Sequence, residues 1–296
     1  LIYDFRVNDQ HNYSKRIIYS SKFYPKLKRI SWVYSWDNSF IYHSILKSDY
    51  FLVWSKKLKK ILHERHRIPE KKILINYPIQ FEYIKKINLK KNNTLLFCCS
   101  YGSSKKDAEK DTNLYIKDDI EMIKHIHNII KVNKLKIKIK VRLYPSTHYV
   151  ESVKELKKLK NLKIDLKSYN FFNKKKFNYN NIKNHLAEKN YLMNNSMAIF
   201  TFGSTVNIEA ARLDKPVFHI DYSTVNRKNN LYKYENFQKN IEDYVFLKSV
   251  KKSNVIKNEK EMKKVLIDLS KRKFKNYLKY SENLKKIFFY NKKFLY

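Results

Sequence analysis

The chain has 296 residues and a formal net charge of +37, because 64 Lys and Arg side chains are opposed by only 27 Asp and Glu. No apolar run approaches the roughly 18 residues of a membrane-spanning helix, which excludes a transmembrane span. The two cysteines, Cys98 and Cys99, are adjacent and would point to opposite faces of a strand, so we expect buried free thiols in a reducing cytoplasm.

Three explanations of the basic charge are open. Lys, Ile, Asn, Tyr and Phe are abundant together while Gly and Pro are scarce, which is typical of an AT-rich coding bias. The second explanation is attraction to an anionic membrane surface, and the third is nucleic-acid binding. No RNP strand or zinc-finger motif accompanies the charge, so we do not expect nucleic acid to be a partner.

The first part of the chain predicts three short strands and one helix. The strands are residues 29–34, 50–54 and 73–75, and the helix is residues 56–66. The first strand delivers Trp36, Asp37 and Asn38 at its carboxyl end, where ligands bind in open α/β sheets. Trp36 can stack on a sugar or a base while Asp37 and Asn38 bond hydroxyl groups; the alternative is a core tryptophan beside a helix cap. These three residues are candidates for the acceptor side or the inter-domain cleft.

After a polar, Lys-rich stretch at 81–93, the chain predicts a second series of strands and helices. Strands are expected at residues 94–99, 136–143 and 162–166, and helices at 118–132 and 185–194. The strand at 136–143 alternates strictly, so one of its faces should be poorly covered or close to a sheet edge. Arg142 lies at its end, where a guanidinium can form paired hydrogen bonds with a donor pyrophosphate.

Residues 191–222 read as one strand–turn–helix–turn–strand unit. An apolar run at 197–202 predicts a buried strand, and Gly203 ends it. Ser204 or Thr205 can cap a short helix whose apolar positions recur through residues 206–213. A proline at position 216 prevents that helix from continuing, and residues 217–220 predict the next strand.

The two glycines mark candidate phosphate-binding turns. A chain of this length would hold roughly 20 glycines at the average usage of about 7%, yet this one has only Gly102 and Gly203. Both follow strand-like runs and precede hydroxyl residues, including Ser103 and Ser204. Such a turn before a helix offers backbone amides, hydroxyls and a helix dipole to a phosphate. An ordinary strand–helix turn with a hydroxyl cap is the alternative for each turn, but the pair favours a phosphate site.

The segment 204–217 (Ser-Thr-Val-Asn-Ile-Glu-Ala-Ala-Arg-Leu-Asp-Lys-Pro-Val) resembles the donor-site signature of GT-B fold glycosyltransferases. The most similar group is that of surface-polysaccharide enzymes related to CDP-glycerol glycerophosphotransferases and capsule sugar transferases. Further stretches agree in order, at residues 35–38, 49–55, 68–73 and 142–146, and sugar epimerases of the same fold carry a similar Ser-Thr-x-x-x-Glu-Ala block. The usual His-Pro pair of the family is Tyr144-Pro145 here, which removes any role of an imidazolium at that position.

The resemblance implies an α/β fold of GT-B type. We expect a doubly wound parallel-sheet donor-binding domain at residues 89–270 and a basic, aromatic helix or tail at 271–296, which either packs back on the protein or lies at a membrane interface. A doubly wound domain of six strand–helix units needs roughly 180 residues. Residues 1–88 are too few for a second one, so we expect an incomplete N-terminal Rossmann-like domain.

The resemblance also implies a glycosyl or polyol-phosphate transferase of cell-surface polysaccharide biosynthesis, cytoplasmic or peripheral on the inner face of the membrane. Its partners would be a nucleotide-activated donor and a glycan or lipid-linked acceptor. The expected donor-binding residues are Gly102, Ser103, Arg142, Gly203, Ser204, Thr205 and Glu209. Glu209 would accept from ribose hydroxyls, unless it is only a carboxylate favoured by the helix dipole. No cofactor or metal is expected, because no Asp-x-Asp motif occurs, and no catalytic base is assigned. A nucleotide-sugar epimerase and a truncated, non-catalytic nucleotide-binding remnant stay open.

Overall fold

The computed structural model describes residues 26, 28, 30–32, 48–76, 79–89, 92–99, 113–143, 150–165, 179–224 and 242–289. The chain divides into two units, which are described separately below. The first comprises Leu1–Glu82 with Lys285–Tyr296, and the second comprises Tyr83–Leu284. The domain limits expected from the sequence, 1–88, 89–270 and 271–296, stay predictions.

The first unit contains a three-stranded parallel sheet in the order β1-β2-β3. The strands are β1 (Ile30–Trp32), β2 (Tyr50–Val53) and β3 (Ile73–Ile75), and the 3-10 helices η1 (Glu70–Lys72) and η2 (Ile79–Tyr83) flank β3. Helix α3 (Lys56–His66) connects β2 to β3, as the sequence predicts. It begins where the Ser55 side chain accepts from the Leu58 amide at 3.2 Å, and it ends at Arg67, whose φ of 53° is left-handed.

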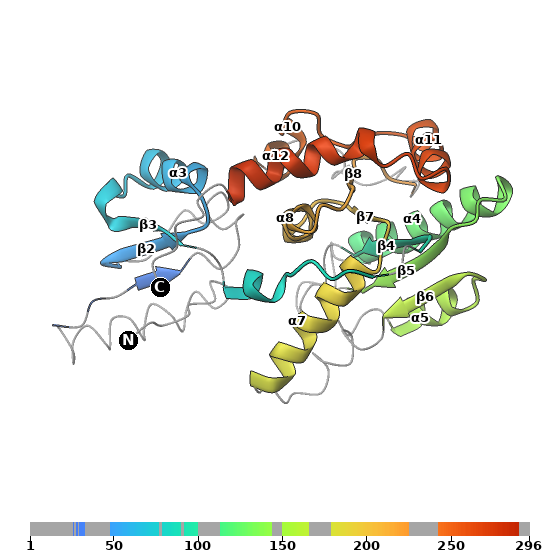
Figure 1. Cartoon of the computed structure of the whole chain (residues 1–296), viewed down its shortest axis with the longest axis horizontal. Helices are drawn as coiled ribbons and strands as arrows, with labels where there is room; N and C mark the ends of the chain where they lie inside the picture. The colour runs from blue at the N-terminus through green and yellow to red at the C-terminus, as the bar shows by residue number, and fades with distance from the viewer. Residues whose placement is uncertain are drawn as a thin grey trace. The chain divides into compact units, whose positions relative to one another are not determined.

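The second unit is built on a six-stranded parallel sheet in the order β6-β5-β4-β7-β8-β9 (Figure 1). The strands are β4 (Thr94–Cys98), β5 (Lys138–Arg142), β6 (Leu162–Asp165), β7 (Ala198–Thr201), β8 (Val217–Ile220) and β9 (Val255–Ile256). All neighbouring strands are parallel. The direction of winding reverses between β4 and β7, which is the doubly wound arrangement. The fold class predicted from the sequence is confirmed.

Helices flank both faces of this sheet (Figure 1). They are α4 (Asn113–Val132), α5 (Val150–Lys157), α7 (Tyr179–Asn194), α8 (Thr205–Arg212), α10 (Glu242–Ser249), α11 (Glu259–Ser270) and α12 (Leu278–Phe288), with the 3-10 helix η5 (Lys275–Tyr277) before α12. Alternate strand residues such as Leu95, Phe97 and Phe200 share one core with apolar residues of α4, α5 and α11. Their neighbours Leu96 and Ile199 point to the opposite face, because successive strand side chains alternate.

The alternating charge of β5 follows from its place in the sheet. β5 lies between β4 and the edge strand β6. Ile139 and Val141 are buried on the core face, whereas Lys138 is exposed and Lys140 is half-buried on the other. The prediction of a poorly covered face near a sheet edge is therefore confirmed. Within the described ranges, no helix is long and apolar enough to cross a membrane.

Side chains of α7 and α8 bind the main chain of the segment 84–87. Asn190 Oδ1 accepts from the Lys85 amide at 3.1 Å, and Asn194 Oδ1 accepts from the Ile87 amide at 3.0 Å. Asn194 Nδ2 donates back to the Lys85 carbonyl at 2.9 Å, and Arg212 Nε donates to the Ile84 carbonyl at 2.8 Å. This short segment is thereby fixed to α7 and α8 through its peptide groups.

Candidate functional site

The candidate site lies at the carboxyl end of the six-stranded sheet, where β4 and β7 are neighbours. Phe97 of β4 is in register with Phe200 of β7, so the turns that follow the two strands begin side by side. This is the point at which the winding reverses, and ligands of doubly wound sheets bind there. Gly203 and Ser204 follow β7 directly.

Several predicted residues lie outside the described part of the chain. They are Gly102 and Ser103, which follow β4, and Trp36, Asp37 and Asn38 of the first unit. The structure thus brings Arg142, Gly203, Ser204, Thr205 and Glu209 to one end of the sheet, and it leaves the other five predictions as predictions.

Gly203 occupies a backbone conformation that favours glycine. Its φ is 103°, within the positive region that a residue with a Cβ enters only at a cost. Its amide donates to Thr201 Oγ1 at 2.9 Å, and that hydroxyl donates to Asn207 Oδ1 at 2.6 Å. The turn is therefore tied together by its own side chains. The Gly203 amide is already engaged, so the predicted donation to a phosphate falls to groups that follow it.

Ser204 is the N-cap of α8, and Thr205 is its first helical residue. Ser204 has extended backbone geometry, and its Oγ accepts from the Val206 amide at 3.1 Å. A hydroxyl that accepts from an amide still has its own proton to donate. The cap is therefore compatible with a phosphate placed at the start of α8, where the helix dipole favours negative charge.

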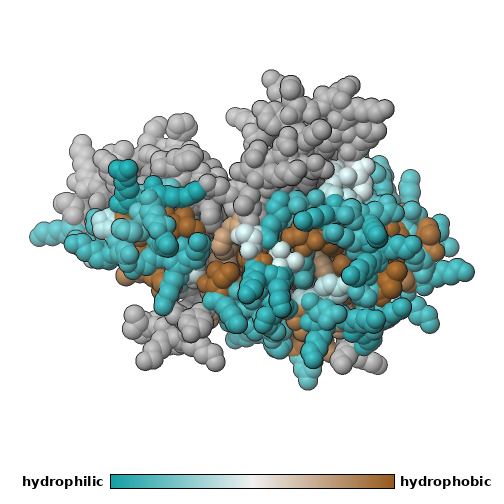
Figure 2. Space-filling view, turned by 90° about the horizontal axis from the view of Figure 1, so that it is seen from above, coloured by the Kyte–Doolittle hydropathy of each residue, from teal (hydrophilic) through white to brown (hydrophobic). Residues whose placement is uncertain are grey.

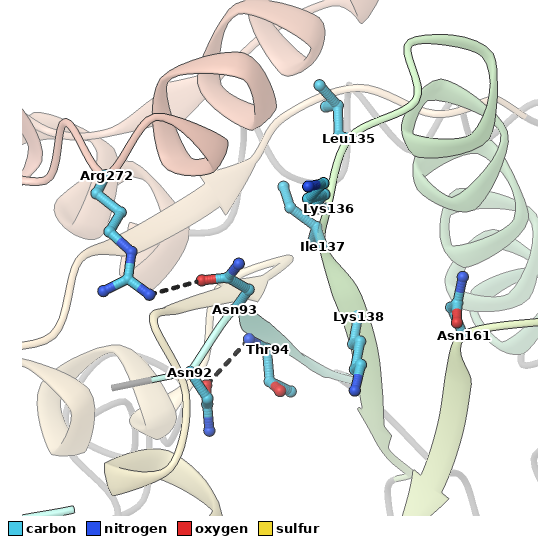
Figure 3. Close-up of a pocket in the computed structure, with 9 residues that line it drawn as sticks. All are labelled: Asn92, Asn93, Thr94, Leu135, Lys136, Ile137, Lys138, Asn161 and Arg272. Carbon is cyan, nitrogen blue, oxygen red and sulfur yellow. Dashed lines mark hydrogen bonds between the residues drawn. The ribbon is translucent and has the colours of Figure 1, made fainter. Parts of the chain in front are cut away.

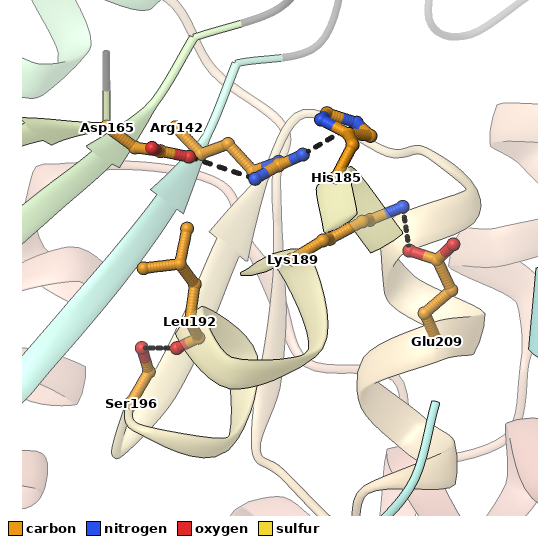
Figure 4. Close-up of polar contacts among 7 residues, drawn as sticks. All are labelled: Arg142, Asp165, His185, Lys189, Leu192, Ser196 and Glu209. Atoms are coloured by element: carbon orange, nitrogen blue, oxygen red, sulfur yellow. Dashed lines mark hydrogen bonds and ion pairs between the residues drawn. The ribbon is translucent and has the colours of Figure 1, made fainter. Parts of the chain in front are cut away.

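Glu209 is buried and paired across two helices. Its side chain is 2% exposed, and its Oε2 forms an ion pair with Lys189 of α7, whose side chain is 17% exposed (Figure 4). The carboxylate is therefore held by a specific cation rather than by the dipole of α8 alone. Lys189 was not predicted from the sequence, because the pair joins residues of different helices.

Arg142 is held between two further residues at the same end of the sheet (Figure 4). It is the last residue of β5 and is in register with Asp165, the last residue of β6. Arg142 Nη1 donates to Asp165 Oδ2 at 2.9 Å, and Nη2 donates to His185 Nε2 at 3.0 Å. A guanidinium has five N–H donors, so these two bonds orient the group and leave capacity for a ligand.

His185 is a neutral hydrogen-bond acceptor in this cluster. Burial, followed by the positive charges of Arg142 and Lys189, lowers the pKa of His185 to about 3. The ring is therefore uncharged at neutral pH. Because Nε2 accepts from the guanidinium, the proton of the neutral ring is on Nδ1.

The charges of this cluster balance in the absence of a ligand. Arg142 and Lys189 are positive, Asp165 and Glu209 are negative, and His185 is neutral. A signal for part of the cluster was present in the sequence, because positions 185 and 189 are four apart on one helix and so share a face. Asp165 gave no signal beyond being the last residue of a predicted strand.

Cys98 lies near the cluster but does not supply a nucleophile. Burial raises the pKa of the Cys98 thiol to about 12, although Arg142 and Lys189 act in the opposite direction. The thiol therefore stays protonated at neutral pH. Both Cys98 and Cys99 are free and buried. In the described residues, no group of three or more His, Cys, Asp or Glu side chains is arranged to hold a metal ion.

A cavity of about 410 Å³ lies at the other end of the sheet (Figure 3). It is lined by Asn92, Asn93, Thr94, Leu135, Lys136, Ile137, Lys138, Asn161 and Arg272. Thr94 and Lys138 are the first residues of β4 and β5, so the cavity lies at the amino ends of the strands. This cavity is separate from the candidate site, and its volume alone does not identify it as the active site.

Comparisons with known proteins give likenesses of structure alone. No protein-family model matches the chain, and no curated protein matches it. The S. aureus MnaA–UDP co-structure aligns with 89% of this chain and 66% of its own length, at 12% identity and a TM-score of 0.52. A protein from Listeria monocytogenes described as a UDP-N-acetylglucosamine 2-epimerase aligns with 89% of this chain and 64% of its own, at 12% identity and a TM-score of 0.51.

The wall teichoic acid polymerase TagF aligns with 96% of this chain and 82% of its own length, at 12% identity and a TM-score of 0.47. This chain spans about two thirds of the MnaA and Listeria structures. At these identities the likenesses show the fold. Together with the strand order of the second unit, they define the chain as an α/β protein of the GT-B fold.

Proposed function

We propose that this chain is a glycosyl or polyol-phosphate transferase that uses a nucleotide-activated donor in cell-surface polysaccharide biosynthesis. The observation that carries the proposal is the convergence of Arg142, Lys189 and the start of α8 at the switch point of the sheet. All three are suited to anionic oxygens. The presence of UDP in the similar MnaA structure supports a nucleoside diphosphate as the group bound there.

Glycosyl transfer releases a nucleoside diphosphate, whereas polyol-phosphate transfer breaks the pyrophosphate bond of the donor and releases a nucleoside monophosphate. In both reactions negative charge develops on the phosphate of the leaving nucleotide. Arg142, oriented by Asp165 and His185, and Lys189 would stabilise that charge. The Ser204 hydroxyl and the first amides of α8 would add neutral donors. Glu209 would accept from ribose hydroxyls. The acceptor, a glycan or a lipid-linked molecule, and the catalytic base would belong to the first unit.

Calorimetric titration of UDP, CDP and GDP, each beside its nucleoside, tests the proposal. The diphosphate should bind more tightly than its nucleoside, because under the proposal only the diphosphate would contact Arg142 and Lys189. Lys189→Gln should lower affinity for the diphosphate by about tenfold, the scale of a hydrogen bond to a charged group, and spare the nucleoside. Lys183→Gln, on an exposed position of the same helix, is the matched control and should change neither. Equal affinities for diphosphate and nucleoside in the unmutated protein would overturn the proposal.

A nucleotide-sugar epimerase is the second candidate. It is favoured by the two structures with TM-scores above 0.5, one bound to UDP and one described as an epimerase. Product analysis separates the reactions. An epimerase converts a nucleotide sugar to its isomer without an acceptor. A transferase forms a new linkage and releases a nucleoside diphosphate (glycosyl transfer) or a nucleoside monophosphate (polyol-phosphate transfer). Binding of the diphosphate with neither product would identify a non-catalytic, nucleotide-binding remnant.

A further inference from the structure

Three loops of the second unit carry basic side chains and no acidic one. They are residues 131–138, which lead into β5, residues 157–161, which lead into β6, and residues 271–275, which follow α11. In a parallel sheet the loops that lead into strands gather at the amino end, opposite the carboxyl-end site. We refer to these three loops together as the amino-end rim.

Hydrogen bonds show that the loops of the rim meet. Arg272 Nη2 donates to Asn93 Oδ1 at 3.0 Å, and the Lys138 amide donates to the Asn93 carbonyl at 2.9 Å. The Ile139 amide donates to the Asn161 carbonyl at 3.0 Å. The cavity of about 410 Å³ lies among them, with Lys136, Lys138 and Arg272 in its lining (Figure 3). The rim is therefore one continuous surface with a recess.

The three loops of the rim contain no carboxylate that would offset their positive charge. The ammonium groups of Lys134, Lys136, Lys160 and Lys273 are on exposed residues, and none has an ion-pair partner among the described residues. Asp268, just before the third loop, accepts from the Tyr277 hydroxyl at 2.7 Å. Glu155, just before the second, is paired with Lys124 at 2.8 Å. The rim thus presents charge of one sign.

An apolar side chain lies among these cations. Val132, the last residue of α4 at the start of the segment 131–138, is 69% exposed. On the face that Figure 2 shows, the described surface is largely hydrophilic with hydrophobic areas between the polar side chains. Lysines with flexible apolar stems around an exposed apolar group suit the headgroup region of a bilayer, where the stems lie along lipid and the ammonium groups meet phosphates.

The composition of the rim favours lipid over nucleic acid. Arg272 is the one guanidinium in its three loops, and the remaining cations are lysines. Nucleic-acid surfaces use arginine forks and exposed aromatic rings for stacking. The aromatic residue of the rim, Phe274, instead packs against the core of the second unit. Diffuse lysine charge matches the diffuse charge of a membrane surface.

We infer that the amino-end rim docks the second unit on a membrane that carries anionic phospholipids. The strands of the sheet then run away from the membrane, and the carboxyl-end site lies about 15–20 Å above the lipid, the length of a five-residue strand. A nucleotide would reach that site from solution. The inference does not depend on the identity of the reaction.

Vesicle co-sedimentation of the whole chain tests the inference. Binding to phosphatidylcholine vesicles that contain phosphatidylglycerol should exceed binding to phosphatidylcholine alone, and it should fall as salt shortens the screening length. Replacing Lys134, Lys136, Lys160 and Lys273 by Gln should weaken binding by about tenfold or more. The control replaces Lys257, Lys260, Lys263 and Lys264, which are exposed in or beside α11, and leaves the same net charge. It should weaken binding less than about twofold.

Val132→Ser supplies a second variant with unchanged charge, and it should also reduce vesicle binding. Thermal unfolding of each variant confirms that it is folded. Equal losses in the rim and control variants would overturn the inference, because the charge would then act diffusely. The inference also fails if the rim variant binds vesicles normally but loses affinity for a labelled RNA or DNA oligonucleotide.

Discussion

The ion pair between Lys189 and Glu209 joins the two residues to which the proposed function assigns contact with phosphate and contact with ribose. Each partner neutralises the other in the unliganded protein, since both are largely buried. A diphosphate beside Lys189 would compete with Glu209 for the Lys189 ammonium group. A ribose hydroxyl would then replace that ammonium group as a hydrogen-bond donor to the Glu209 carboxylate. The two residues should therefore respond differently when the parts of a nucleotide are tested separately.

Glu209→Gln should weaken binding of nucleoside and nucleoside diphosphate alike, by about 1–3 kcal/mol, because both ligands carry the ribose. Lys189→Gln should affect the diphosphate alone. Titration calorimetry on both variants with both ligands measures the difference. If Glu209→Gln lowers the melting temperature but leaves both affinities unchanged, Glu209 is a structural carboxylate and the assignment to ribose is wrong.

The neutral His185 predicts a pH dependence of stability. Its pKa is lowered from 6.5 to about 3 in the folded protein, chiefly by burial. Below about pH 6.5 the unfolded chain binds a proton at this histidine and the folded chain does not, so the free energy of unfolding falls with falling pH. Between pH 7 and pH 5 the expected loss from this group is about 1–2 kcal/mol.

Urea denaturation at pH 7 and pH 5 measures that loss. In His185→Asn the free energy of unfolding should depend less on pH than in the unmutated protein. The control is His127→Asn, which removes a ring that bonds the Lys160 carbonyl at 2.8 Å and should keep the full pH dependence. Identical pH dependence in the unmutated protein and His185→Asn would contradict a neutral, buried His185.

At the scale of elements, the turn from β7 into α8 shows how a short motif is shaped by its own bonds. Gly203 has the positive φ, Thr201 holds its amide, and Ser204 caps the helix. Gly203→Ala adds a methyl group at φ 103° and should destabilise the protein by about 1 kcal/mol or more. It should also lower affinity for nucleoside diphosphate, since the methyl group narrows the approach to the turn. Denaturation and calorimetry measure the two effects.

Ser204→Ala is the companion variant for Gly203→Ala. It removes the cap and should cost about 1 kcal/mol of stability. If the hydroxyl also donates to a phosphate, affinity for the diphosphate falls while affinity for the nucleoside is kept. A loss of stability in both variants with all affinities intact would leave the turn a structural feature and remove it from the donor site.

The elements show which parts of the fold can be predicted from local sequence. The strands β4 and β7 are largely apolar runs, because both of their faces are buried, and β8 is apolar except for the buried His219. Helix α3 shows its buried face at helical spacing. Helix α7 was expected from residue 185 but begins at Tyr179. The first residues of α7, Tyr-Asn-Asn-Ile-Lys-Asn, have the composition of a loop. Local helix propensity is a weak predictor there, because tertiary context can extend a helix beyond its favourable residues.

The residues of the candidate site also divide into those that local sequence predicts and those that it does not. Gly203, Ser204 and Glu209 lie within one local motif, and Arg142 ends a recognisable strand, so all four were predicted. Asp165, His185 and Lys189 were not predicted, because they reach Arg142 or Glu209 only once β6 and α7 take their places in the fold. A sequence pattern shows residues that are close along the chain, whereas these residues are far apart in sequence and come together only in the folded structure.

At the scale of the whole molecule, the basic aromatic end of the chain is in large part a packed element. Tyr280 and Leu284 of α12 are fully buried, and Ser281 Oγ donates to the Lys215 carbonyl at 2.6 Å. Leu284→Ala should therefore lower the free energy of unfolding by about 2–5 kcal/mol. Denaturant titration measures the loss, with Lys279→Ala on the exposed face as the control, expected within about 0.5 kcal/mol of the unmutated protein. A neutral Leu284→Ala would show that α12 is dispensable for the second unit.

The hydrogen bonds between α7 and the segment 84–87 affect which residues of this protein can be substituted during evolution. Asn190 and Asn194 contact peptide amides and a carbonyl, which every residue except proline presents in the same way. The exposed positions 85 and 87 can therefore exchange side chains in related chains, with proline excluded, whereas the two asparagines cannot be replaced without losing the bonds. Ile84 is buried and is restricted to an apolar residue. Over long divergence the segment would keep its path and an apolar residue at 84 while positions 85 and 87 vary, so conservation at this place should be sought mainly in α7.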